Sequence, residues 1–121
     1  MPRSSIAFTR DPLDIDALAR AVSTVLTAEE LAETPVEVRP LDDGAAAQVL
    51  LLDRVVLTVL RPRLTPSPTE LARVYGLTDV DRDATRWSTE AVTPWEPEGV
   101  IGIRLLEAAA AERAGRVAHQ S

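Results

Sequence analysis

The chain has 121 residues, of which 45% are hydrophobic and 26% are charged, a composition typical of one globular domain. All 13 basic residues are arginine and asparagine is absent, which is typical of a GC-rich bacterial genome. The lack of cysteine excludes disulfides, thiolate metal sites and thiol catalysis. A net charge of −6 without any basic segment argues against a nucleic-acid partner, because binding a duplex requires the protein to neutralise several phosphates.

From the sequence we expect no secretory signal at the start of the chain and no membrane-spanning helix. Residues 1–10 lack the continuous apolar run of a secretory signal, and no stretch approaches the ~20 apolar residues of a membrane-spanning helix. We therefore expect residues 1–10 to be a flexible N-terminal tail, residues 11–117 a single α+β domain, and residues 118–121 a frayed C-terminus. The protein is expected in the cytoplasm, without a membrane partner.

The first predicted elements are helical. Asp11 followed by Pro12 predicts the start of a helix, because the aspartate can accept from free amides and proline fits the first turn. Apolar residues then recur at helical spacing over residues 15–26. Thr27 and Glu30 have the spacing of a capping box, which predicts a second short helix directly afterwards.

Residues 36–60 change to β-branched and aliphatic runs, which predicts a meander of three strands. We place these strands at residues 36–41, 45–52 and 55–60, and Pro62 stops the ladder because proline has no amide hydrogen to donate. Four nearby arginines are expected to be balanced by acidic neighbours on a surface of mixed charge. The arginines are Arg39, Arg54, Arg61 and Arg63, and the acids are Glu37, Asp42, Asp43 and Asp53.

The second half predicts a helix over residues 68–75, a fourth strand over residues 87–92 and a helix over residues 97–117. Gly99 and Gly102 weaken the first turns of the last helix, and a strand over residues 100–104 is the alternative. The predicted fold is α+β, with an antiparallel three- to four-stranded meander sheet, helices on at least one face, and the order α-β-β-β-α-(β)-α. That order resembles, in topology alone, the αβββαβα arrangement of secretion-chaperone-like domains.

No catalytic motif is visible in the sequence. The only histidine, His119, lies two residues from the end, where the expected mobility opposes the fixed geometry of a general base. Serines without a nearby base are weak nucleophiles. We therefore expect no catalytic residue, no cofactor and no enzyme, with a cofactor-free enzyme that uses carboxylates and arginines as an alternative.

A second alternative is a calcium-binding module. Asp79, Asp81, Asp83 and Glu90 occupy the first, third, fifth and twelfth positions of an EF-hand loop, where carboxylates converge on a cation. Ala84 replaces the glycine of the sharp turn, so the loop is degenerate. The competing interpretation is that the aspartates line the first turn of a helix, which favours negative charge, and no metal site is therefore assigned.

The strongest functional signal is the apolar character of both faces of the hairpin at residues 45–60. An antiparallel strand with one face in water alternates apolar and polar residues, so two apolar faces imply that each is covered. Either the chain's own helices cover both, or a second copy or another protein covers one. We predict a small protein-interaction module, homodimeric or adaptor- or chaperone-like, with its interface at Leu50, Leu52, Val56, Leu60, Trp87 and Trp95.

Overall fold

The computed structural model describes residues 3–65, 73, 85–94, 98–113 and 115–120. This part of the chain has an α+β fold, with a seven-stranded antiparallel sheet and three helices. The strands are β1 (Arg3–Thr9), β2 (Val36–Leu41), β3 (Ala46–Leu51), β4 (Arg54–Leu60), β5 (Arg63–Leu64), β6 (Trp87–Thr93) and β7 (Arg116–Gln120). The helices are α1 (Ile15–Val25), α2 (Ala28–Glu33) and α4 (Glu98–Glu112), with a short 3-10 turn η1 (Asp42–Gly44). None of these described helices is long and apolar enough to cross a membrane.

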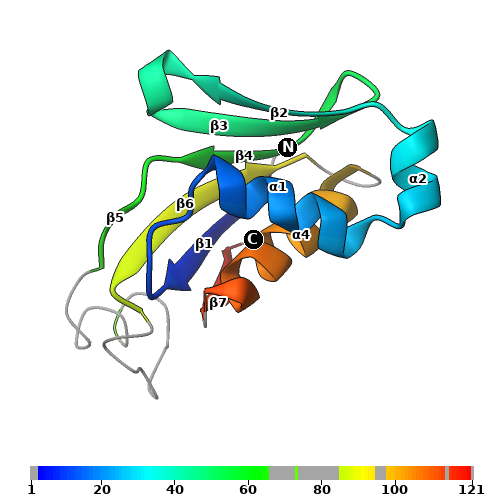
Figure 1. Ribbon diagram of the computed structural model, residues 1–121. Helices are drawn as coiled ribbons and strands as arrows, with labels where there is room; N and C mark the ends of the chain where they lie inside the picture. Colours follow the sequence, from blue (N-terminus) through cyan, green and yellow to red (C-terminus); the bar gives the residue numbers. More distant parts are fainter. Residues whose placement is uncertain (1–2, 66–72, 74–84, 95–97, 114, 121) are drawn as a thin grey trace.

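The sheet has the strand order β2-β3-β4-β6-β1-β7, and the short β5 pairs with β6 beside β4. The predicted meander is confirmed as β2-β3-β4, with bounds within one residue of those expected. Figure 1 shows α1 and α4 packed side by side in front of this sheet, with α2 beyond one end. We call the side covered by α1 and α4 the helix face, and the opposite side the outer face.

The two predicted N-terminal helices are present, although the first begins later than expected. Asp14, not Asp11, caps α1, and its side chain accepts a hydrogen bond from the Ala17 amide at 2.8 Å. The capping box is confirmed: the Glu30 amide donates to the Thr27 hydroxyl, and the Thr27 amide donates to the Glu30 carboxylate, both at 3.1 Å. The hydrogen bond from the Thr27 amide lowers the pKa of Glu30, and the Thr27 side chain lowers it further.

The prediction of a flexible tail over residues 1–10 is wrong. Residues 3–9 form β1, which pairs with β6 on one side and β7 on the other. Phe8 and Ala7 are 0% exposed, and Ser5, Ile6 and Thr9 are also buried. A strand between two others can be short and can contain small polar residues, because its neighbours satisfy its whole backbone.

The predicted C-terminal end is also wrong. The last helix ends at Glu112, and after Gly115 the chain turns back as β7 and pairs with β1, so residues 118–120 belong to the sheet. The alternative strand at residues 100–104 is excluded because these residues lie inside α4. The observed order of elements therefore begins and ends with a strand, and the sheet has seven described strands where three or four were expected. The helix predicted at residues 68–75 lies, apart from residue 73, outside the described residues.

The core lies between the sheet and the two long helices. From the sheet it includes Ala7, Val49, Leu57 and Ala91, and from the helices Leu18, Ala21, Val22, Leu105, Leu106, Ala109 and Ala110. A register shift between β3 and β4 places an extra residue, Val56, in β4. Two ion pairs, Arg20 with Glu112 and Arg113 with Asp14, tie α1 to α4 across the top of this core.

Candidate interaction surface

No described helix lies on the outer face of the sheet. Apolar side chains nevertheless occupy it, because β1 directs Ile6 and Phe8 to the side opposite Ala7, which belongs to the core. Ile6 and Phe8 are only 6% and 0% exposed, and Leu50 of β3 is 5% exposed. Of the hairpin residues predicted on the second apolar face, Leu50 is therefore buried, whereas Leu52 and Leu60 are exposed, so the surface open to a partner is smaller than the whole hairpin.

The structure separates the predicted interface residues. Leu52 is 62% exposed in the turn between β3 and β4, whereas Leu60 is 39% exposed at the far end of β4. At about 3.3 Å per residue, these two side chains lie at opposite ends of a hairpin roughly 20 Å long. Trp87 is half-buried at the start of β6, and Trp95 lies outside the described residues.

Val56 does not lie where strand alternation predicted. The sequence placed Val56 opposite Leu57 and on the same face as Leu60, but Val56 is 1% exposed and belongs to the core. The cause is the irregularity in β4, because an extra residue in one strand allows two successive side chains to face the same way. Val56 is therefore covered by the chain itself.

Two large apolar side chains of the described strands are exposed within residues 60–64, which we call the 60–64 corner. Leu60 is 39% exposed and Leu64 is 67% exposed, with the exposed Arg61 and Arg63 between them. The corner is fixed to β6: the Ser88 hydroxyl donates to the Arg63 carbonyl at 3.4 Å, and β5 pairs with β6. These side chains are therefore presented on an anchored backbone.

A cleft lies on each side of this corner. The larger, of about 380 Å³, separates the start of α1 from the ends of β3 and β4 and is mostly apolar; it is lined by Leu13, Asp14, Ile15, Asp16, Leu18, Gly44, Ala46, Ala47, Val59, Leu60, Arg61 and Pro62. The smaller, of about 160 Å³, lies on the outer face and is lined by Ile6, Phe8, Arg61, Arg63, Leu64, Ser88 and Glu90. Arg61 borders both clefts.

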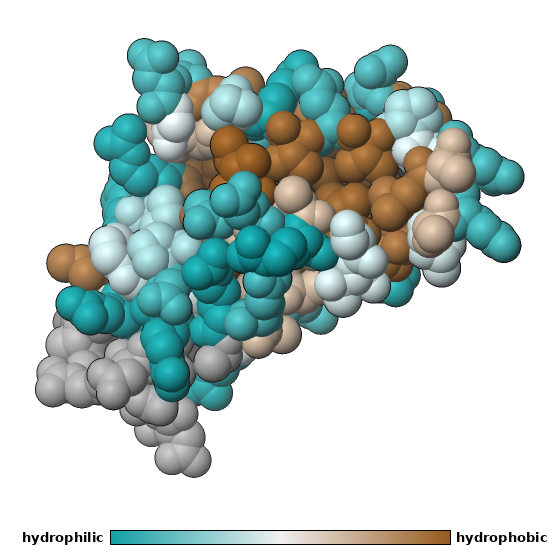
Figure 2. Space-filling model, viewed as in Figure 1, coloured by the Kyte–Doolittle hydropathy of each residue, from teal (hydrophilic) through white to brown (hydrophobic). Residues whose placement is uncertain are grey.

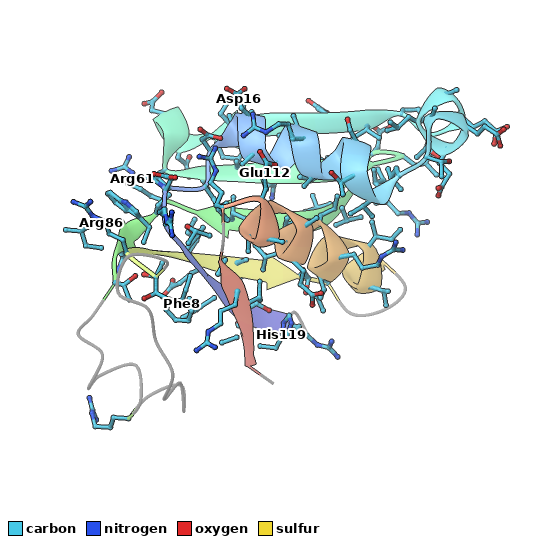
Figure 3. The ribbon with its side chains drawn as sticks, turned by 60° about the horizontal axis from the view of Figure 1, so that its bottom comes forward. Phe8, Asp16, Arg61, Arg86, Glu112 and His119 are labelled. Atoms are coloured by element: carbon cyan, nitrogen blue, oxygen red, sulfur yellow. The ribbon has the colours of Figure 1, made fainter. Side chains whose placement is uncertain are left out.

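Three arginines, Arg61, Arg63 and Arg86, lie at or beside this corner of an acidic protein, and Asp14, Asp16 and Glu90 line the same clefts. Figure 3 shows Arg61 and Arg86 on the same side of the molecule, well away from Glu112 and His119. The Thr65 amide donates to the Arg86 carbonyl at 3.0 Å, which brings residue 86 beside the corner. Among the hydrogen bonds and ion pairs of the described residues, none involves the side chain of Arg61, Arg63 or Arg86. Arg61 and Arg63, which were expected to be balanced by acidic neighbours on a surface of mixed charge, therefore form no ion pair with them within the described residues.

A third cleft, of about 500 Å³, lies at the turn end of the hairpin and includes Leu52 and Val56. Its charged residues already have partners: Glu30 belongs to the capping box, and Arg54 also has an interaction. The exposed Leu52 has a left-handed backbone, with φ of 52°, as a tight two-residue hairpin turn requires. This end therefore offers an apolar side chain but fewer free charges than the 60–64 corner.

The candidate calcium loop can be followed at one residue only. Glu90 is exposed on β6, whereas Asp79, Asp81 and Asp83 lie outside the described residues. In the part of the chain that the structure describes, no three histidine or carboxylate side chains come together in a way that could hold a metal ion.

One polar cluster, which links β1, β7 and α4, was not predicted from the sequence. The Ser5 hydroxyl lies 2.9 Å from His119 Nδ1, and His119 Nε2 lies 3.1 Å from the Glu107 carboxylate. This order of groups resembles a serine hydrolase relay, but Ser5 is 2% exposed and lines none of the described clefts. The cluster therefore fastens β7 to α4 and β1. The missing signal was β7 itself, because the sequence predicts a frayed end at residues 118–121, where the structure has a strand.

The chain matches none of the protein families, curated proteins and solved structures with which it was compared.

Proposed function

We propose that this chain is a cytoplasmic, non-enzymatic protein-interaction domain, with a homodimeric or adaptor- or chaperone-like role, that binds a protein segment at the 60–64 corner. The observation that carries the proposal is the exposure of Leu60 and Leu64 on an anchored backbone between two clefts. Large apolar side chains exposed together, with polar groups around them, are typical of interaction sites. The proposal keeps Leu60 and Trp87 of the predicted interface and adds Arg61, Arg63 and Leu64.

The charges around the corner indicate the chemistry of the partner. Arg61, Arg63 and Arg86 offer guanidinium groups that carboxylates can bind with two parallel hydrogen bonds. The rest of the molecule is acidic, with a net charge of −6, and would repel an acidic segment that approached elsewhere. We infer a partner segment with leucine-like side chains for the clefts and aspartate or glutamate beside them.

The buried position of Ser5 supports an interaction role over catalysis. A nucleophile must meet its substrate, and Ser5 would do so only if β7 separated from β1. The described clefts beside the corner contain carboxylates and arginines, and the arginines there suit recognition of a charged segment.

The proposal is tested by selecting binders from a displayed library of random peptides on the purified domain. We expect enriched peptides that combine acidic and large aliphatic residues. In a Trp95→Phe background, Trp87 is the only tryptophan, and it lies opposite Leu64 in the β5–β6 pair. Its fluorescence should therefore change when a selected peptide binds at the corner.

Two sets of variants distinguish binding at the 60–64 corner from non-specific hydrophobic binding elsewhere on the surface. Leu60→Ser with Leu64→Ser should weaken binding at least about tenfold, since each removes an apolar contact worth about 1 kcal/mol or more. Val100→Ser, at a residue 46% exposed on α4, should leave the affinity unchanged. Failure to enrich any peptide class, or equal affinity of the double serine variant, would refute the proposal.

A further inference from the structure

The edge strand β2 carries a second interaction surface, distinct from the 60–64 corner. In Figure 1, β2 lies at the margin of the sheet, and it pairs with no described strand other than β3. An edge strand presents a row of backbone N–H and C=O groups that another strand can bind. The question is which strand has a complementary pattern of backbone and side-chain groups.

The backbone groups of β2 that point outward can be assigned from its pairing with β3. The Leu52 amide donates to the Pro35 carbonyl at 3.0 Å, one position before β2 begins. Because hydrogen-bonded pairs alternate in an antiparallel ladder, the groups of Val36, Val38 and Pro40 point away from β3. The position of Pro40 agrees with this assignment, since proline has no N–H and would leave a gap in the ladder if it faced β3.

The side chains of β2 divide into a charged and an apolar row. Glu37 and Arg39 lie opposite Leu50 and Gln48 on the outer face, and both are exposed. Val36 and Val38 lie on the helix face and are only partly buried against the core. Figure 2 shows a band of apolar side chains across the part of this face where α1 and the β2–β3 hairpin lie.

We propose that β2 pairs antiparallel with β2 of a second copy of this chain, about a two-fold axis at Val38. In that register Val38 lies opposite the partner's Val38, and the two exchange both backbone hydrogen bonds. Each Val36 amide donates to the partner's Pro40 carbonyl, so every outward N–H from Val36 to Pro40 has an acceptor. Glu37 of each copy lies directly opposite the partner's Arg39 on the outer face, which gives two pairs of opposite charge.

The neighbouring two-fold registers do not pair both the backbone groups and the opposite charges in this way. Pairing about Glu37 would set Glu37 against itself, and pairing about Arg39 would set Arg39 against itself, both with like charges directly opposite. Pairing about Pro40 would lose the central hydrogen bonds, because proline has no N–H. The other edge strand, β7, could pair with itself about a two-fold axis at Ala118. Arg116 would then lie opposite Gln120, so no pair of opposite charges would form. The opposite charges of Glu37 and Arg39 therefore favour β2 over β7 as the dimer edge. Together with the outward backbone groups, they favour the register about Val38.

The helix faces of the two copies would lie on the same side of a continuous sheet, because the two-fold axis is perpendicular to it. The apolar row of Val36, Val38 and Pro40 would meet the same row of the partner. The apolar band beside α1 in Figure 2 would then continue across the seam. The second copy would thereby cover part of the helix face that α1 leaves exposed next to β2.

A cysteine cross-link tests the register, since the natural chain has no cysteine. In Val38→Cys the two thiols face each other across a hydrogen-bonded pair, with about 5.5 Å between Cα atoms, which suits a disulfide. Mild oxidation should convert this variant to a covalent dimer at least about tenfold faster than Ala118→Cys, its counterpart on the other edge strand. Equal rates for the two variants would overturn the proposal.

Charge reversal tests the pairing in the protein without cysteine, by sedimentation at several concentrations. Glu37→Arg alone and Arg39→Glu alone should each weaken the dimer about tenfold, because two attractive pairs become repulsive. The double variant should recover most of the affinity, and circular dichroism should show the same fold for all. A wild-type chain that stays monomeric at about 1 mM, or a double variant as weak as the single ones, would refute the β2 dimer. A dimer disrupted by Leu60→Ser with Leu64→Ser, but not by charge reversal, would refute it while supporting the 60–64 corner.

Discussion

Replacing Gly102 by alanine tests how closely α4 approaches the sheet. From the sequence alone this change should stabilise the protein, since alanine is favoured over glycine inside a helix by about 1 kcal/mol. The structure reverses that expectation. A Cβ atom at residue 102 would lie 1.8 Å from the backbone oxygen of Val56 and 2.9 Å from the Thr93 methyl carbon.

The magnitude follows from how far α4 would have to move. A carbon atom and a carbonyl oxygen approach no closer than about 3.3 Å, so α4 would retreat from β4 by roughly 1.5 Å. That movement would loosen Leu105, Leu106 and Ala109, which are all 0% exposed. Overpacking costs about 1–3 kcal/mol, and the rigid strand backbone at this contact places the cost at the upper end. After the helix preference is subtracted, we expect a net loss of about 2 kcal/mol and a Tm lower by roughly 6–10 °C.

The assay is urea unfolding followed by circular dichroism, with thermal unfolding as the second measure. Gly44→Ala is the matched control, because a Cβ there meets nothing within 4 Å but the residue has φ of +91°. It should lose only about 1 kcal/mol, the cost of a left-handed conformation for alanine. If Gly102→Ala proves as stable as the natural chain, the close packing of α4 on β4 is wrong.

Two further outcomes test β1 and the capping box. Phe8→Ala should lower the free energy of unfolding, measured by urea denaturation, by about 3–5 kcal/mol, because removing a fully buried ring leaves a cavity. Leu64→Ala, at an exposed residue, should change it by less than about 0.5 kcal/mol. A small effect of Phe8→Ala would mean that β1 is peripheral to the fold. The Glu30 carboxyl should titrate below its value in the unfolded chain, so its contribution to stability is present above the unfolded pKa and is lost as pH falls through the folded pKa. An NMR titration of Thr27→Ala should show a partial rise of the Glu30 pKa, because the hydroxyl is lost while the backbone amide of residue 27 still donates to the carboxylate; an unchanged pKa would mean that the Thr27 side chain does not lower it.

The elements that depend on local signals could be predicted from the sequence. The capping box at Thr27 and Glu30 is specified by residues three apart, and it is present as expected. The β2-β3-β4 meander needs only neighbouring strands and tight turns, and its bounds were predicted within one residue. Such elements are stabilised by contacts between residues close in the chain, which a single sequence displays directly.

The elements that were missed depend on contacts far apart in the chain. The pair Ser5 and His119 is separated by 114 positions, and both residues belong to strands in segments that were predicted to be loose ends. Neither strand has the long β-branched run that marks a strand by itself, because each is stabilised by the neighbour it meets in the sheet. The position of Val56 was missed for a related reason, since a bulge is set by the register between two strands.

The same distinction explains why the candidate surfaces were only partly foreseen. Two apolar faces on the hairpin implied that both were covered, and Leu50 is indeed buried on the outer one. The exposed Leu60 and Leu64 became visible as a site only when β5 and β6 were paired, because Arg86 is brought beside them by a segment distant in the sequence. The β2 edge depends on one further long-range fact: β1 and β7, from the two ends of the chain, complete the sheet on its other side. With β1 and β7 on that side, β2 pairs with no described strand other than β3, and its outer edge is the one that the proposed second copy would use.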